Sequence, residues 1–279
     1  PHPVIKAKCF DYILENAPIY INPSDPFGIA LEAIKLTPLL DVGCNPDKIL
    51  ISLSTQWQIE LEDKLYLPED AHFSKYAGGY LLNEFYIDYN HSSPSWEDIL
   101  KYGISGLLKR ATHYKTELSK KAPLTEEQLA YFEGIEITYN AVLKLFKRYI
   151  IALSEKTEPK MQCMKKAFEN LINNPPENTY EALLLAWQYW FLQENIDYVR
   201  VRTMGGIDGL YYNFYKNDLE NGTFTEEDIK GLFLYFMNEF NAIRVHYQEP
   251  IYLGGMDENG NCIVNDLSYL VLDAYNILS

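Results

Sequence analysis

Apolar side chains recur at three- and four-residue steps along most of the chain, which is the spacing of a helix with one buried face. This spacing predicts helices over residues 4–17, 96–108, 126–156, 159–173, 179–189, 210–219, 226–243 and 265–274, and a further apolar periodicity over 28–40. Between residues 41 and 90, glycines and prolines break short apolar runs, and the pattern predicts no element there. We therefore expect a single, mainly α-helical unit.

Polar residues at the predicted helix starts support these boundaries. Thr125 and Gln128 have the spacing of a capping box, in which each side chain bonds the backbone N–H of the other residue. Ser95 and Thr225 stand where a hydroxyl can accept a hydrogen bond from the first turn of the helix that follows. These signals predict helix starts at residues 96, 126 and 226.

The period changes near residue 250. The run PIYL at residues 250–253 ends in Gly254 and Gly255, which is typical of a short buried strand followed by a close backbone turn. The composition of residues 257–261, DENGN, predicts a turn. We expect residues 249–255 to form the only long buried strand of the chain, in a central position.

Composition and charge narrow the class of protein. The chain has 279 residues, 47% of them hydrophobic, which is enough to bury a sizeable core. Its net charge of -15 repels phosphate backbones and anionic lipid surfaces, so nucleic acid and membranes are not expected partners. No apolar run is long enough to cross a bilayer, and no secretory signal pattern opens the chain, so we expect a cytoplasmic protein.

The cysteines and the chain ends complete this picture. Four cysteines stand far apart, without a CxxC pair or a histidine at ligand spacing, so we expect free thiols, no metal site and no disulfide framework. The chain opens at Pro1 without a methionine and stops at Ser279 within an apolar helical pattern. We expect it to be a fragment of a longer protein.

Motifs between residues 178 and 278 carry a resemblance to a known family. TMGGID at 203–208 is similar to the S-x-G-R-x-D segment of pyruvate formate-lyase-like glycyl radical enzymes, and GTFTEE at 222–227 to their G-x-[IL]-T-E-E helix start. QEPIYLGGMD at 248–257 resembles their Q-x-[IV]-x-[IL]-G-G-x-D strand, and NDLSYL at 265–270 their N-x-L-S-Y-L helix. Four such pieces in order over about a hundred residues are hard to obtain by chance.

Fainter matches extend the resemblance toward the N-terminus. KCFDYILENAPIY at 8–20 resembles the opening helix of the family, and HSSPSWEDIL at 91–100 its G-H-x-x-P-D-Y-x-x-[VI]-L motif. The resemblance is thin between residues 41 and 80. It implies that residues 1–279 are the N-terminal part of a pyruvate formate-lyase-like domain.

The resemblance implies a ten-stranded α/β barrel surrounded by helices, with its first strand near residues 249–255. In this family a glycyl radical, installed by a radical-SAM activase, generates a thiyl radical that abstracts hydrogen from the substrate. No R-V-x-G-Y radical motif and no cysteine-loop context occur in this chain. We therefore expect no catalytic residue and no directly bound cofactor here. The remainder of the barrel, the activase and, at full length, a second copy in a homodimer are the expected partners.

Four residues are candidates for substrate binding. His91 matches the histidine of the G-H-x-x-P-D-Y motif and could exchange a proton with a leaving hydroxyl. Asn83 stands eight residues earlier, Thr203 replaces the serine of S-x-G-R, and Asp208 matches an acid of the family. His91 and Asn83 could equally be loop residues, Thr203 a helix cap, and Asp208 a buried acid with a structural partner. Gly206 stands where the family has arginine, so an ion pair from that position is lost.

The lack of basic side chains in one loop narrows the choice of enzyme subtype within the family. Pyruvate formate-lyase itself binds a carboxylate through arginine, whereas residues 83–94 contain neither arginine nor lysine. The dehydratase and C–X lyase branch, which acts on polyols, hydroxyproline, choline or isethionate-type substrates, is therefore favoured, with an arylacetate decarboxylase as another possibility.

Two alternatives remain open. One is a non-catalytic scaffold or split-gene subunit of the same fold that acts by binding a partner, and the other is a helical-repeat module. Against the repeat module stands the lack of a repeat of 34–45 residues.

Overall fold

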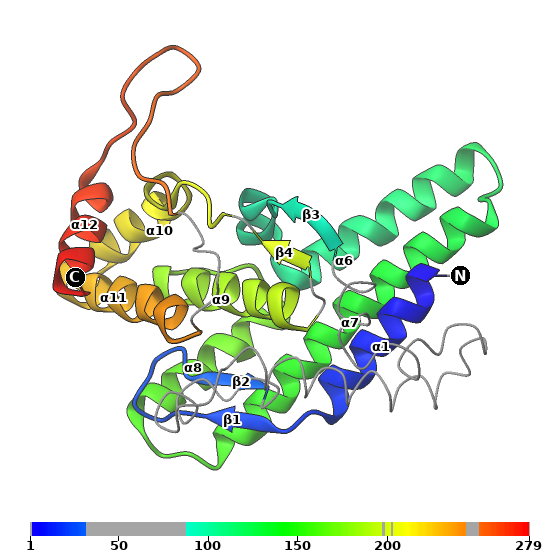
Figure 1. Cartoon of the computed structure of the whole chain (residues 1–279), viewed down its shortest axis with the longest axis horizontal. Coiled ribbons are helices and arrows are strands. Elements are labelled where there is room, and N and C mark those ends of the chain that lie inside the picture. The colour runs from blue at the N-terminus through cyan, green and yellow to red at the C-terminus, as the bar shows by residue number, and fades with distance from the viewer. Residues whose placement is uncertain (1, 32–87, 197–198, 202, 244–250, 279) are drawn as a thin grey trace.

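The computed structural model describes residues 2–31, 88–196, 199–201, 203–243 and 251–278, and these ranges are mostly helical, as the sequence predicts (Figure 1). The helices are α1 (His2–Asn16), α6 (Trp96–Lys121), α7 (Glu126–Ser154), α8 (Pro159–Leu171), α9 (Thr179–Asn195), α10 (Ile207–Asn221), α11 (Glu226–Ile243) and α12 (Asp266–Leu278). The strands are β1 (Ile19–Ile21), β2 (Ile29–Leu31), β3 (Asp88–Ser92) and β4 (Val199–Val201). The mainly α class is thus confirmed.

The predicted helix starts are present, with one correction. The N–H of Gln128 donates to the Thr125 hydroxyl at 3.2 Å, and the N–H of Thr125 donates to the Gln128 side chain at 3.0 Å, so the capping box is confirmed. The Thr225 hydroxyl likewise accepts from the N–H of Asp228. Ser95 precedes α6, but its hydroxyl makes no capping bond. Its ψ of 80° departs from the extended conformation that directs an N-cap hydroxyl toward the first turn.

Helix α6 is longer than predicted and carries a kink at Gly103. The backbone there has φ 60° and ψ 178°, yet the helix resumes and continues to Lys121. A Cβ at Gly103 would lie 2.9 Å from the carbonyl oxygen of Asn174, so the helix touches the turn after α8 at this point. The Ser105 hydroxyl donates to the Asn173 carbonyl at 2.8 Å and holds the same contact.

Helix α9 lies at the centre of the packing. Its side chains from Ala182 to Gln188 are all at most 1% exposed, so it is buried on every face rather than along one stripe. Helices α6, α8, α10 and α11 and strand β4 all contact it. Trp187 and Trp190 stack with their ring centroids 5.3 Å apart, and Phe240 of α11 packs edge-on against both. Helix α9 is therefore the core helix of the described chain.

The first two strands form an antiparallel hairpin that is bound to α9. Ile19 pairs with Leu31, and the three residues of β2 are fully buried. The Tyr180 hydroxyl donates to the Pro26 carbonyl at 2.6 Å, and the Gln188 side chain donates to the Ile29 carbonyl at 2.9 Å. Within the periodicity noted over 28–40, residues 29–31 are therefore strand, and residues 32–40 lie outside the described chain.

Helix α1 packs along α7 and ends at an arginine of that helix (Figure 1). The Arg148 guanidinium donates to the carbonyls of Leu14 and Ala17, two groups that the end of a helix leaves without internal partners. Lys144 pairs with Asp11 at 3.0 Å one turn away. A single basic side chain thus caps α1 and fixes it on α7.

Strands β3 and β4 form a short parallel pair that the sequence pattern does not predict. Asp88 aligns with Val199 and Ser92 with Val201, with an irregularity between the two alignments. The pair joins the segment before α6 to the segment after α9. It places residues near 90 beside residues near 200 although about 110 residues of chain separate them.

The expected buried strand near residues 249–255 needs correction. Within its described part, residues 251–255, only Tyr252 pairs, through one parallel bridge to Gly206. Gly254 and Gly255 have φ of 66° and 117°, Tyr252 is 56% exposed, and Ile251 and Leu253 are only partly buried, so the expectation of a long, fully buried strand is wrong for these residues. The described chain offers this segment one neighbouring backbone, residues 205–207, and a segment paired along one edge keeps its other side open.

Replacing two glycines by alanine should have opposite effects. Gly103→Ala puts a Cβ where φ is positive and where it would press on the Asn174 carbonyl, so we expect a loss of at least about 1–2 kcal/mol in the free energy of unfolding. Gly231, inside α11, has no atom within 4 Å of its Cβ position. Gly231→Ala should stabilise by about 0.5–1 kcal/mol. Urea unfolding measures both, and equal effects would contradict the kink.

A buried acid pair joins the β1–β2 loop to α11. Glu239 is 4% exposed and Asp25 is 8% exposed. Asp25 accepts the N–H of Phe27 at 2.8 Å. Burial, reinforced by the hydrogen bond and negative charge of Asp25, raises the pKa of Glu239 to about 10. Glu239 is therefore protonated in the folded chain at neutral pH and donates to Asp25.

Because of Glu239, the free energy of unfolding should decrease as the pH rises. From its ordinary pKa of 4.5 up to about 10, Glu239 ionises in the unfolded chain but not in the folded chain, which costs at most about 1.4 kcal/mol per pH unit. Glu239→Gln should remove this slope, so the variant gains on the wild type steadily between pH 5 and 9. Urea unfolding across that range measures the difference.

The exposed Glu133, on α7, provides the matched control for this titration. Glu133→Gln makes the same chemical change at an exposed position and shows what the substitution does without burial. A Glu239→Gln difference that stays constant with pH would contradict the protonated pair.

Candidate functional site

Residues 203–208, between β4 and α10, contact three other parts of the chain. The first contact is with the start of α6, where the Trp96 indole N–H donates to the Thr203 carbonyl at 2.9 Å. Trp96 is 4% exposed, so this bond lies in the core. The Thr203 hydroxyl accepts the N–H of Gly205 at 2.9 Å, which is a local turn bond.

The second contact is with the segment that contains Tyr252. The N–H of Ile207 donates to the Tyr252 carbonyl at 3.0 Å, and the N–H of Tyr252 donates to the Gly205 carbonyl at 3.2 Å. These two bonds hold the segment parallel to residues 205–207. Thr203 therefore lies two residues from the point where the extended segment is attached.

The third contact is made by Asp208, at the start of α10. Its side chain is 1% exposed, and one carboxylate oxygen accepts both the N–H of Gly254, at 2.6 Å, and the Ser268 hydroxyl. The other oxygen accepts the N–H of Gly209 at 3.0 Å. The first turn of a helix also favours a negative charge. Asp208 thus joins α10, α12 and the Gly254 turn through one buried carboxylate.

Gly254 donates this bond from a particular backbone conformation. Its φ is 66°, a region that residues with a Cβ rarely adopt, and a Cβ there would lie 2.8 Å from the Val264 side chain. The Asn265 amide completes the cluster by donating to the Asp208 carbonyl at 3.2 Å. The two glycines noted in the sequence therefore serve a turn held by a carboxylate.

The predicted substrate-binding residues fall into three groups. Asn83 lies outside the described residues. For His91 the structure describes only the backbone, in β3 beside β4. His91 directly precedes Ser92, which aligns with Val201, and Val201 lies two residues before Thr203. Thr203 and Asp208 are described, and Asp208 makes the structural contacts that were its alternative role. The convergence of His91, Asn83 and Thr203 on one cavity stays a prediction.

Sequence reasoning missed the partners of this segment. Trp96 falls at the start of the helix predicted over residues 96–108, and its indole N–H carries no signal in the sequence. The serine of NDLSYL had a recoverable signal, because Asn265 and Ser268 have capping-box spacing. Each of these two side chains accepts the other's backbone N–H, at 3.0 and 3.2 Å. Serine at this position caps α12 and also reaches Asp208.

The position of the missing family arginine is not crowded. Gly206 has φ -79° and ψ 94°, and no atom lies within 4 Å of its Cβ position. Asp208, two residues on, already has its oxygens occupied by donors of the protein. The glycine is thus not required by packing, and Asp208 does not need the arginine as a partner.

The cysteines and the other polar clusters show no catalytic arrangement in the described residues. Cys163 and Cys262 are exposed, Cys9 is partly buried, and Cys44 lies outside the description. No group of three metal-binding side chains gathers within the described ranges. Among the described helices, none is both long and apolar enough to span a bilayer.

Comparison with known proteins identifies the family. Residues 63–279 match the family model described as pyruvate formate lyase-like. The chain belongs to this family. The match covers most of the chain and includes the 203–208 segment, the Gly254 turn and α12, so the resemblance drawn from these motifs is confirmed.

Individual relatives agree with the family. Isethionate sulfite-lyase of Oleidesulfovibrio alaskensis is 26% identical over 243 residues, which is 75% of this chain and 29% of that protein. The 4-hydroxyphenylacetate decarboxylase glycyl radical subunit of Clostridioides difficile is 22% identical over 200 residues, 63% of this chain and 22% of that protein. The B12-independent glycerol dehydratase of Clostridium butyricum, solved with glycerol, superposes with a TM-score of 0.68 at 17% identity, covering 99% of this chain and 41% of that chain.

The chain thus spans less than a third of the length of these curated family members and about two fifths of the solved one. Its helical architecture is that of the corresponding part of a glycyl radical enzyme. At 17% identity, the superposition with a TM-score of 0.68 establishes the fold alone.

Replacing Asp208 by asparagine should release the Gly254 turn. An amide offers one acceptor oxygen where the carboxylate serves three donors, so a buried donor loses its partner and the free energy of unfolding should fall by about 1.5–3 kcal/mol. Hydrogen exchange at the Gly254 amide should accelerate as well. Asp257→Asn is the control, because Asp257 also accepts bonds from two neighbouring residues but is exposed. A larger effect at Asp257 would contradict the role of Asp208.

Proposed function

We propose that these 279 residues are the N-terminal part of a glycyl radical enzyme of the dehydratase or C–X lyase type, acting on a small polar substrate. The observation that carries the proposal is the 203–208 segment. In this segment Thr203 and Asp208 match the serine and the acid of the S-x-G-R-x-D motif. The segment is hydrogen-bonded to the start of α6, to Tyr252 and to the Gly254 turn. A substrate-binding wall needs such rigid support.

The substrate-facing groups in this proposal are His91, Asn83 and Thr203. The β3–β4 pair and the bond from Trp96 to Thr203 bring the backbone near His91 and that near Thr203 to neighbouring positions. A histidine near a bound hydroxyl can transfer a proton to it as it leaves. In the proposal the Thr203 hydroxyl, which accepts the Gly205 N–H, lies against a substrate oxygen. Asp208 acts on the site by positioning the Gly254 turn.

The substrate class follows from chemistry and from the relatives. Residues 83–94 carry no cationic side chain that could bind a carboxylate, which favours a neutral polyol or an isethionate-type substrate over pyruvate. Relatives named for isethionate and glycerol are consistent with this preference. The decarboxylase relative keeps arylacetate as the other substrate class to test.

The radical groups of the family do not fit any residue of this chain. No R-V-x-G-Y motif occurs in the sequence, and the exposed Cys262 lies beside a turn, bridged through Met256. In the proposal, a glycyl radical and a thiyl cysteine come from the remaining length of the family domain, after the action of a radical-SAM activase. The residues described here bind and orient substrate.

An apolar surface marks where that remainder would pack. Residues 251–264 project from the helices as an extended loop in Figure 1, and Met256, which is bridged to Cys262 within it, is 77% exposed. Tyr252, Ile263 and Val264 on the loop, and Tyr269, Leu272, Tyr275 and Ile277 on α12, are between 41% and 63% exposed. Exposed apolar groups on this scale are typical of a surface that is covered by other protein. In the proposal, further strands of the barrel pair with Tyr252 and cover them.

A second candidate function uses the same surface without catalysis. Gly206 replaces the family arginine although the site has room for a side chain. A split-gene subunit or scaffold that only binds the remainder of the barrel would tolerate that loss. A homodimer, expected at full length, is compatible with either function.

Activation with and without the remaining domain length distinguishes these functions. Treated anaerobically with an activase and S-adenosylmethionine, this chain alone should give no glycyl-radical signal in electron paramagnetic resonance. The longer polypeptide read from the same genomic locus should give the doublet and turn over a polyol or isethionate. A radical in the short chain, or a locus without a cysteine loop and R-V-x-G-Y segment, would contradict the enzymatic proposal.

In that active polypeptide, His91→Gln should lower kcat by about 10²–10⁴-fold, because the proton donor for the leaving group is lost. Ser93→Ala, two residues away in an exposed position, is the matched control and should leave kcat unchanged. An active His91→Gln enzyme would remove His91 from the site and leave the family assignment intact.

A further inference from the structure

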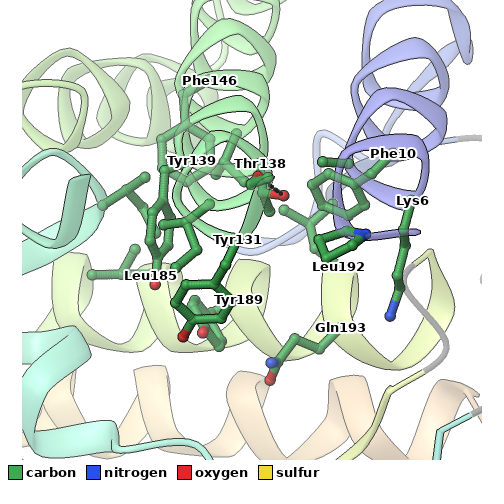
Figure 2. Close-up of a pocket in the computed structure, with 16 residues that line it drawn as sticks. Lys6, Phe10, Tyr131, Thr138, Tyr139, Phe146, Leu185, Tyr189, Leu192 and Gln193 are labelled. Carbon is green, nitrogen blue, oxygen red and sulfur yellow. Dashed lines mark hydrogen bonds between the residues drawn. The ribbon is translucent and has the colours of Figure 1, made fainter. Parts of the chain in front are cut away.

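A cavity of about 410 Å³ lies between α1, α7 and α9, apart from the 203–208 segment (Figure 2). Its inner wall is apolar, with Phe10, Phe146 and Leu185 each at most 6% exposed. The volume lies within the range of small-molecule sites, about 300–1,000 Å³. The walls are rigid, because α1 is bound to α7 through the two Arg148 bonds.

Several polar side chains line this cavity, namely Lys6, Thr138, three tyrosines and Gln193. In Figure 2 the hydroxyl ends of Tyr131, Tyr139 and Tyr189 and the amide of Gln193 point to the same side, whereas Phe146 and Phe10 lie on the other. The hydroxyls of Tyr139 and Tyr189 are hydrogen-bonded to each other. The cavity is therefore amphipathic, with a ring-lined apolar interior and a polar edge.

One polar atom of that edge has no partner. The Gln193 side-chain oxygen is buried and accepts no hydrogen bond from any group in the described chain. A buried acceptor without a donor costs about 1–3 kcal/mol, so such atoms are rare unless something supplies the donor. A ligand N–H or O–H would remove this cost.

From these observations we infer that the cavity is a binding site for a small neutral aromatic molecule with one hydroxyl, whose ring packs among Phe10, Phe146 and Leu185 and whose O–H donates to the Gln193 oxygen. A carboxylate at this position would face the Gln193 acceptor oxygen, and Lys6, the one cation of the lining, already interacts with another group of the chain. A ligand without a donor would leave Gln193 unsatisfied. Both features favour a phenol-like compound.

Trp96 links this cavity to the candidate substrate site, because it contacts a residue of each. Tyr189 of the cavity packs edge-on against Trp96, with ring centroids 6.0 Å apart. Trp96 in turn donates its indole N–H to the Thr203 carbonyl. A bound ring that shifts Tyr189 would therefore reach the backbone of the 203–208 segment through two contacts. The inference itself concerns binding and does not depend on the proposed function.

Phenol and anisole, titrated into the 279-residue chain by calorimetry or ligand-observed NMR, test the inference. The two probes share a ring, but only phenol donates a hydrogen bond. Phenol should bind at least about tenfold more tightly than anisole, the factor that 1.4 kcal/mol represents. Gln193→Leu should weaken phenol to the affinity of anisole and leave anisole unchanged.

Two further variants complete the test. Asn140→Leu makes the same kind of change at an exposed position of α7 and should preserve the preference for phenol. Ala7→Leu enlarges a buried residue of the cavity wall and should abolish binding of both probes. Absence of binding by the wild-type chain, equal affinities for the two probes, or an undiminished preference for phenol in Gln193→Leu would overturn the inference. Circular dichroism of each variant verifies that it is folded.

Discussion

The burial of α9 on all its faces is the constraint on which the rest of the described structure depends. An apolar helix with no polar side can be stable in water only if other elements surround it. The Trp187–Trp190 stack and Phe240 show how closely they do so. The β1–β2 hairpin, α6, α8, α10 and α11 are each positioned against this helix. The position of α9 also sets where the next segments lie, because β4, which leads into residues 203–208, packs against it.

A second constraint is polar. The described chain leaves the segment at Tyr252 with a backbone partner on only one edge. Ile251 and Leu253 are only partly buried against the core and Tyr252 is largely exposed, so burial alone does not determine where the segment lies. The Asp208 carboxylate takes over that task by accepting the Gly254 N–H and the Ser268 hydroxyl together. A buried carboxylate that serves several donors is strongly directional, so it determines where the glycine turn lies as well as that it is attached. The geometry next to Thr203 is thereby defined.

These two constraints give the chain rigid walls on both sides of Trp96. On one side, Thr203 and the Gly254 turn form the wall that the proposed substrate site uses. On the other, Tyr189 belongs to the ring-lined cavity with the unpartnered Gln193 oxygen. The exposed apolar residues of α12 and the 251–264 loop are typical of a surface that is covered by other protein. The family match, with less than a third of each curated relative covered, agrees with that physical picture.

Helical periodicity and short motifs predicted the helices, the capping box at Thr125 and the family, because both kinds of signal lie within a few residues of chain. The tertiary structure alone decided three other features: the parallel pairing of β3 with β4, the bond from Trp96 to Thr203, and the protonated Glu239 beside Asp25. Each of them joins residues about 110 or more positions apart. Whether an indole N–H finds a carbonyl, or an acid meets another acid out of water, depends on packing around α9, and no local pattern records that packing.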